Sequence, residues 1–133
     1  MFELLPHTAD VRVRIEAATL EELFRDALHA MMSCAQARPD LDSTTIYREI
    51  AVTSVDRTAL LVDFLNEALA LSIVEEEMYV DVRFRTLGSA DLAATLVGTR
   101  AAFDDEIKAV TYHEADVVQK GDGGWTTVLV FDI

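Results

Sequence analysis

Apolar and charged residues alternate along residues 11–16, which read Val-Arg-Val-Arg-Ile-Glu. A period of two places successive side chains on opposite faces, so this pattern predicts a strand with Val11, Val13 and Ile15 toward the core. The period then becomes helical, with apolar residues at Leu20, Leu23, Phe24, Ala27, Leu28, Met31 and Met32. Thr19 stands three residues before Glu22, as in a capping box. We therefore predict a long amphipathic helix over residues 19–34.

A second helical pattern follows a polar loop and a strand. Residues 36–45 contain Pro39-Asp40 and predict a loop, and residues 46–55 predict a strand. A helix is then expected from about Asp56, with apolar residues at Leu60, Leu61, Phe64, Leu65, Ala68 and Leu69. Its other face carries Asp63, Asn66 and Glu67, for which a solvated helix surface is the preferred interpretation over a ligand site.

The remaining chain is rich in aliphatic, aromatic and threonine residues. These predict strands over residues 78–87, 91–103, 106–119 and 125–132, separated by glycine-containing turns and by a tight Asp104-Asp105 connection. The expected fold class is α+β, a mainly antiparallel β-sheet with the two amphipathic helices packed on one face.

Length and charge limit the function classes. With 133 residues the chain has the size of a single domain, expected to span residues 1–133. Its 24 acidic and 11 basic side chains give a net charge of −13, which repels phosphate backbones. We therefore expect no direct nucleic-acid binding, and any link to RNA should run through a partner. No signal peptide or membrane span is recognisable, so a cytoplasmic location without membrane contact is expected.

Known catalytic motifs are missing from the sequence. It has no glycine-rich phosphate loop, no Gly-x-Ser-x-Gly elbow, and no His-Glu-x-x-His or paired-cysteine metal motif. The single cysteine, Cys34, cannot form an internal disulfide and is expected to be a small buried side chain. His29 lies among apolar helix residues and is interpreted as structural.

Acidic groups stand near both ends of the chain. Asp132 is followed by Ile133, whose main-chain carboxylate ends the sequence, and Asp10 precedes the first predicted strand. If the strands that carry them are neighbours, three carboxylates gather, and such crowding raises their pKa values unless a cation is bound. All-oxygen ligands suit calcium, magnesium or manganese and disfavour zinc. From the residues alone, an ordinary exposed strand-end aspartate is the simpler interpretation of Asp132.

Lys108, His7 and His113 are further candidates. Lys108 is the only basic residue of the segment 107–113, where it is either a surface lysine or a contact to a phosphate or to an acidic residue of a partner. Strand alternation places Lys108 with Val110 and Tyr112, and His113 on the opposite face. His7 is either structural or a supporting hydrogen-bond partner of Asp10.

Four ordered blocks resemble the archease family. They are His7-Thr8-Ala9-Asp10, Leu60-Leu61-Val62-Asp63-Phe64-Leu65-Asn66-Glu67, Ile107-Lys108-Ala109-Val110-Thr111-Tyr112-His113 and the terminal Phe131-Asp132-Ile133. The resemblance implies a non-enzymatic accessory protein of the GTP-dependent RNA-splicing ligase of the RtcB type. That ligase joins RNA ends bearing a 2′,3′-cyclic phosphate or 3′-phosphate to a 5′-hydroxyl. The accessory protein would promote ligase guanylylation and repeated turnover in tRNA splicing or RNA repair.

The resemblance also implies site residues. The metal ligands would be Asp10, Asp132 and the Ile133 carboxylate, with calcium as the preferred ion and magnesium or manganese as alternatives. Lys108 would contact the partner or a phosphate. His7 and His113 would support the metal ligands without contacting the metal.

Two competing functions remain open at the level of the sequence. One is a chaperone or modulator of a tRNA-modifying enzyme such as a tRNA methyltransferase, and the other is an autonomous metal-dependent hydrolase. The chain also departs from the family pattern, since Gly98-Thr99-Arg100 and the short Asp104-Asp105 connection replace a Gly-Glu pair and a longer charged loop. A partner contact from that hairpin is therefore in doubt.

Overall fold

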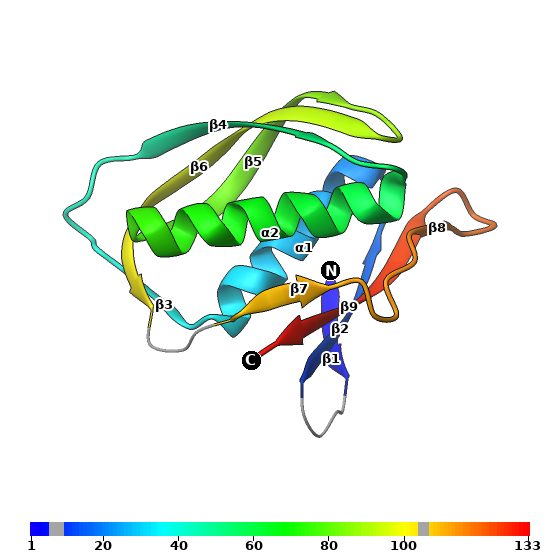
Figure 1. Cartoon of the computed structure of the whole chain (residues 1–133), viewed down its shortest axis with the longest axis horizontal. Coiled ribbons are helices and arrows are strands. Elements are labelled where there is room, and N and C mark those ends of the chain that lie inside the picture. Colours follow the sequence, from blue (N-terminus) through cyan, green and yellow to red (C-terminus); the bar gives the residue numbers. More distant parts are fainter. Residues whose placement is uncertain (6–9, 104–106) are drawn as a thin grey trace.

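A computed structural model describes residues 1–5, 10–103 and 107–133 of the chain (Figure 1). His7 and the Asp104-Asp105 connection lie outside the described residues. The elements follow in the order β1 (Phe2–Leu5), β2 (Val11–Ala17), α1 (Leu20–Cys34), β3 (Ala37–Pro39), β4 (Ile46–Thr53), α2 (Arg57–Glu75), β5 (Glu77–Leu87), β6 (Asp91–Phe103), β7 (Ala109–Thr111), β8 (Val118–Gln119) and β9 (Trp125–Asp132).

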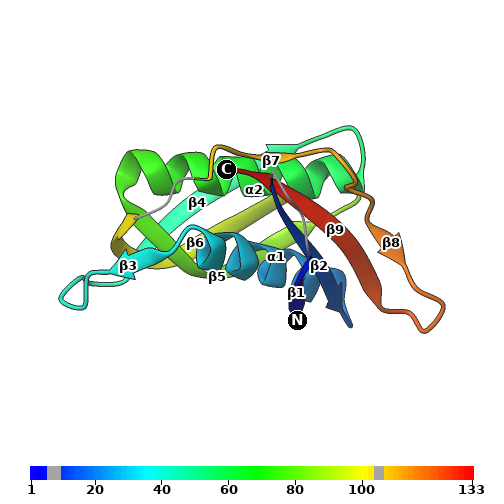
Figure 2. The ribbon, with the colours of Figure 1, turned by 90° about the horizontal axis from the view of Figure 1, so that it is seen from below.

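The strands form two antiparallel sheets. One has five strands in the order β1-β2-β9-β7, with β8 also paired to β9, and the other has four in the order β3-β6-β4, with β5 also paired to β6. Both helices contact strands of both sheets, so one face of each sheet packs against them (Figures 1 and 2). The predicted α+β class is confirmed, with the single expected sheet divided in two.

Both helices begin where their capping residues predict. The Thr19 side chain accepts a hydrogen bond from the Glu22 amide at 3.2 Å, and the Asp56 side chain accepts one from the Ala59 amide at 2.8 Å. These caps satisfy amide groups that the first turn of a helix leaves without partners.

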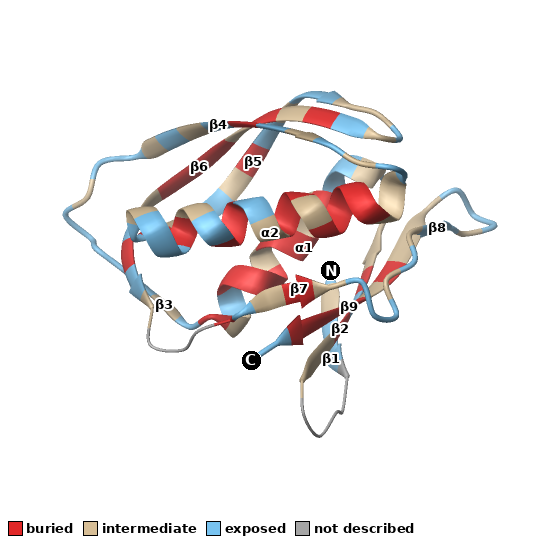
Figure 3. Cartoon of the chain, viewed as in Figure 1, coloured by how far each residue is buried: buried red, intermediate tan, exposed pale blue. Residues whose placement is uncertain are grey.

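The core lies where helices and sheets meet. Phe24 of α1, Phe64 of α2 and Phe84 of β5 form an aromatic cluster with ring centroids 5.7–6.0 Å apart. The consecutive residues Ala59–Val62 of α2 are all buried, because the first half of this helix is enclosed on most sides (Figure 3). Met31 and Met32 are buried in the core as predicted. Among the described residues, no helix is long and apolar enough to cross a membrane.

The predicted continuous strand over residues 106–119 is wrong. Its described part contains only the short strands β7 and β8, which pair with different stretches of β9. Between them the backbone turns at Glu114, which has a φ of 63°. The Val117 amide then donates to the Thr58 side chain of α2 at 3.0 Å, instead of joining a strand ladder. The polar loop predicted at 36–45 likewise contains the short strand β3, and β1 was not predicted.

Candidate functional site

Three of the predicted site residues meet at one end of the five-stranded sheet. In the antiparallel pair β2 and β9, Val11 lies opposite Phe131, so Asp10 and Asp132 are the next residues at this end. On the other side of β9, Ala109 of β7 lies opposite Asp132, and the Lys108 amide donates to the Asp132 carbonyl at 2.8 Å. The first predicted strand and the last one are therefore neighbours (Figure 1). This is the condition that a shared carboxylate site requires.

Strand alternation places the two carboxylates on the same face. Val13 and Ile15 of β2 and Leu129 and Phe131 of β9 are fully buried against the helices. Asp10 and Asp132 have the opposite phase and belong to the outer face of the sheet. Asp132 is exposed and Asp10 is half-buried. Solvent can thus reach this pair.

The oxygen donors at this end of the sheet are of the type that a hard cation prefers. Two aspartates from adjacent strands supply carboxylate oxygens, and Ile133 follows Asp132 directly. Within residues 1–5, 10–103 and 107–133, no three His, Cys, Asp or Glu side chains gather as a metal cluster. The two aspartates alone therefore do not form a metal cluster, and the third ligand of the sequence-based hypothesis is the Ile133 carboxylate.

An ion pair crosses β9 beside this site. The Arg12 guanidinium on β2 donates two hydrogen bonds to the Glu114 carboxylate, at 2.8 and 3.0 Å. Arg12 lies opposite Val130, which is only 1% exposed although its phase places it on the outer face. The paired side chains hold the turn after β7 to β2.

The strand that follows Lys108 is held by polar residues of α2. The Asn66 side chain accepts from the Val110 amide at 2.9 Å and donates to the Val110 carbonyl at 2.8 Å. The Asp63 carboxylate accepts from the Tyr112 hydroxyl and, at 2.6 Å, from the Ser54 hydroxyl. The bond to Asp63 raises the pKa of Tyr112.

Asp63 and Asn66 are half-buried and hydrogen-bonded, so the predicted solvated helix surface is wrong for these two residues. Glu67 is exposed, as that prediction states. Helical periodicity indicates which face is polar but not what packs on it. The sequence feature that could have indicated a packed polar side chain was Asn66 itself, because asparagine is a poor helix former and this one stands in the middle of an apolar helix.

The predicted alternation of side chains between two strand faces is also wrong for residues 107–113. Ile107 and Val110, three residues apart, would face opposite sides of a regular strand, yet they are only 1% and 2% exposed. Lys108 and Tyr112 are exposed, although they share the predicted face of Val110. The reason is that regular strand geometry extends only over Ala109–Thr111. His113 lies in the turn beyond β7 and is exposed.

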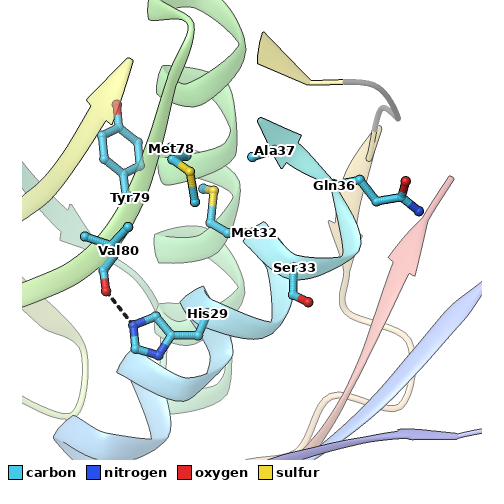
Figure 4. A pocket seen from close by; sticks show the side chains of 8 residues that line it. All are labelled: His29, Met32, Ser33, Gln36, Ala37, Met78, Tyr79 and Val80. Carbon is cyan, nitrogen blue, oxygen red and sulfur yellow. Dashed lines mark hydrogen bonds between the residues drawn. The ribbon is translucent and has the colours of Figure 1, made fainter. Parts of the chain in front are cut away.

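A cavity of about 400 Å³ between α1 and β5 does not include the predicted site residues (Figure 4). One of its walls carries His29, whose Nε2 atom lies 2.7 Å from the Val80 carbonyl oxygen. Because Val80 lies on β5, at an edge of the four-stranded sheet, this contact satisfies a carbonyl of an open strand edge. The interpretation of His29 as structural agrees with this contact.

Comparisons with known proteins agree with the family resemblance of the sequence. The model of the Archease protein family (MTH1598/TM1083) matches residues 2–133. The protein archease of Methanosarcina barkeri is 33% identical over 141 residues, covering 99% of this chain and 95% of the relative. The protein archease of Thermococcus gammatolerans is 32% identical over 144 residues, covering 99% of this chain and 98% of the relative.

Two solved structures share the fold. The Thermotoga maritima crystal structure, described as an archease and possible chaperone, has a TM-score of 0.70 and 26% identity, covering 97% of this chain and 94% of that one. The solution structure of Methanobacterium thermoautotrophicum protein 1598 has a TM-score of 0.67 and 26% identity, with coverages of 99% and 98%. The resemblance stated from the sequence is thus confirmed.

Proposed function

Since this chain belongs to the archease family, we propose that it is a non-catalytic activator of a GTP-dependent RNA-splicing ligase of the RtcB type. It would promote guanylylation of the ligase and repeated turnover through an acidic tip, which we define as Asp10, Asp132 and the Ile133 carboxylate. The supporting observation is the pairing register, by which Asp10, Lys108 and Asp132 stand at the same end of the adjacent strands β2, β7 and β9.

The acidic tip would hold a hard divalent cation. Calcium is the preferred ion, with magnesium or manganese as alternatives, because the ligands are carboxylate oxygens. The bound ion would supply a positive charge that attracts phosphate oxygens. Asp10 and Asp132 would hold that charge at one end of the sheet, where a partner could approach it.

Lys108 would make the second contact. Its side chain is exposed, and its amide is fixed to the Asp132 carbonyl at 2.8 Å. An ammonium group there suits a nucleotide phosphate or an acidic residue of the ligase. The net charge of −13 favours a protein partner over RNA as the surface that this chain contacts.

Ligase guanylylation tests this proposal. Purified ligase from the same organism, GTP and manganese are combined with wild-type protein, Asp132→Ala or Lys108→Ala, each checked for folding by circular dichroism. We expect sub-stoichiometric wild-type protein to stimulate guanylylation and both variants to lose most of that effect. Asp42→Ala, in an exposed loop, and Lys120→Ala, beside the turn before β9, are matched controls that should retain it. Equal stimulation by all five proteins would exclude the proposed site.

The second candidate function is a chaperone or modulator of a tRNA-modifying enzyme such as a tRNA methyltransferase. The description of the Thermotoga maritima relative as a possible chaperone favours it. Failure of the wild-type protein to stimulate its own organism's ligase, together with an altered product pattern of such an enzyme, would select this alternative.

A further inference from the structure

β7 is an edge strand, and its outer edge is bonded by a side chain. The five-stranded sheet ends at β7, whose middle residue is Val110. Its N–H donates to Asn66 Oδ1 at 2.9 Å and its C=O accepts from Asn66 Nδ2 at 2.8 Å. A carboxamide offers one donor side and one acceptor side, as a peptide group does, so Asn66 takes the place of a neighbouring strand.

A third hydrogen bond strengthens this arrangement. Asp63 precedes Asn66 by three residues, so the two side chains lie on one face of α2. Its carboxylate accepts from the hydroxyl of Tyr112, which lies just past the end of β7. Between them on the helix, Phe64 and Leu65 are fully buried in the core. We name Asp63 and Asn66 the α2 clip, since they join the short strand to a firmly packed helix.

The α2 clip fixes the register of a strand too short to fix its own. A three-residue strand has few ladder bonds, and a slip by one residue would move Val110 out of its buried position and break both bonds to Asn66. Lys108 lies one residue before β7, with its amide bonded to Asp132. A slip of β7 would therefore also move Lys108 away from the acidic tip.

We propose that Asn66, assisted by Asp63, is a positioning residue that holds β7 in register and thereby keeps Lys108 beside Asp132. Asn66 acts through Lys108 and does not itself contact the partner. The functional consequence rests on the proposed role of Lys108 in ligase activation, whereas the positioning itself does not.

Amide hydrogen exchange tests the positioning. Asn66→Ala removes both bonds, and Asn66→Asp keeps an acceptor for the Val110 amide but sets a carboxylate oxygen against the Val110 carbonyl. Asn66→Ala should accelerate exchange at Val110 by about tenfold or more, the effect of a lost local hydrogen bond, and Asn66→Asp should accelerate it less, because the Val110 amide keeps an acceptor. Tyr112→Phe removes only the Asp63 bond and should give a smaller acceleration. Glu67→Ala, which alters the exposed residue next to Asn66, should leave the exchange rate at Val110 unchanged. Unaltered exchange at Val110 in both Asn66 variants would overturn the proposal.

A double-mutant cycle tests whether Asn66 acts through Lys108. Stimulation of ligase guanylylation is measured for wild type, Asn66→Ala, Lys108→Ala and the double variant. If Asn66 positions Lys108, the double variant should be no worse than Lys108→Ala alone. If the losses of stimulation in the two single variants multiply in the double variant, Asn66 does not act through Lys108. A general structural effect of Asn66 would be independent of the Lys108 side chain and would multiply in this way. Lack of stimulation by wild type would instead refute the proposed function, with the exchange data still deciding the positioning.

Discussion

Asp10 reaches the acidic tip because of the pairing register of β2 and β9. Val11 lies opposite Phe131 and Val13 opposite Leu129, so the residue before Val11 falls beside Asp132. A shift of the register by one residue would turn the buried Val13 outward, so core packing protects the position of Asp10. The geometry of the tip is therefore a consequence of apolar residues that never touch it.

Asp10→Asn should weaken binding of calcium or manganese without unfolding the protein. The substitution keeps the shape of the side chain but removes a negative charge from a site made of carboxylates. Isothermal calorimetry should show a clear loss of affinity, and circular dichroism should be unchanged. An affinity equal to that of wild type would remove Asp10 from the site.

Residues appended after Ile133 should impair the tip. They convert the terminal carboxylate to a neutral peptide group, which leaves Asp10 and Asp132 as the only acidic ligands proposed. We expect a C-terminally tagged protein to bind the cation more weakly and to stimulate the ligase less than an N-terminally tagged one. If the two tagged proteins perform equally, the Ile133 carboxylate is not a ligand.

Glu77 is a buried carboxylate that is paired with an arginine. Only 2% of the residue is exposed, and its oxygens accept from the Arg48 guanidinium at 2.8 and 2.9 Å and from the Tyr79 hydroxyl at 2.9 Å. The hydrogen bonds from Arg48 hold the pKa of Glu77 below its usual value. A carboxyl group whose pKa is lowered by folding stabilises the protein above its unfolded pKa, and this contribution is lost as the pH falls through the folded value.

Glu77→Gln should therefore lower the unfolding free energy most at neutral pH, by roughly 2 kcal/mol for the loss of a charged hydrogen-bond network. Urea unfolding across the pH range should show the deficit narrowing as the pH falls below the unfolded-state pKa of a glutamate and through the lowered folded-state pKa of Glu77, where the wild-type carboxylate becomes protonated. Glu67→Gln, on the exposed face of α2, serves as the control. A deficit that does not depend on pH would assign the effect to packing instead of charge.

Among the helices and strands, the sequence correctly predicts those features that depend only on the residues of the segment itself. The alternation of β2 and the caps of α1 and α2 lie within those segments, and all three are confirmed. β3, β7 and β8 have two or three residues each, and they exist because a longer strand beside them offers an edge. The α2 clip escaped prediction for a similar reason, because the partner of Asn66 lies in a distant segment.

Gly98 shows how closely two strands approach in the four-stranded sheet. A Cβ atom at this position of β6 would lie 2.1 Å from the Met78 carbonyl oxygen and 2.9 Å from the Tyr79 ring. The β5–β6 register shifts just beyond this point, between Tyr79 and Asp81, so the strands are locally irregular. The contact is with backbone, which cannot rotate away.

Gly98→Ala should destabilise the protein by roughly 1–3 kcal/mol, the usual cost of overpacking. Urea unfolding should show a lower midpoint with an unchanged denaturant dependence. Gly121→Ala is a matched control, because among the described residues other than its chain neighbours no heavy atom lies within 4 Å of the corresponding Cβ position. Equal stability of Gly98→Ala and wild type would mean that the strands separate there without cost.

Many of the few basic side chains of the molecule form ion pairs with acidic groups. Ion pairs with acidic groups hold Arg12, Arg14, Arg25, Arg48, Arg85 and Lys120. Within the described residues, at least six of the 11 basic side chains of the chain are therefore paired, against 24 acidic ones in the sequence. A phosphate backbone is bound by cationic surface that releases counterions, and paired arginines supply little of it.

The purified protein should therefore not bind RNA by itself. Fluorescence anisotropy with a labelled RNA bearing a 2′,3′-cyclic phosphate should show no saturable binding at 50 mM salt, where electrostatic attraction is strong. The same titration in the presence of the ligase should report only the affinity of the ligase, since the contact of this chain is proposed to be with that protein. Saturable binding that weakens steeply as salt is raised would contradict this view, because it would reveal a cationic surface able to contact RNA directly. Losing that binding in Lys108→Ala would then place the RNA contact beside the acidic tip.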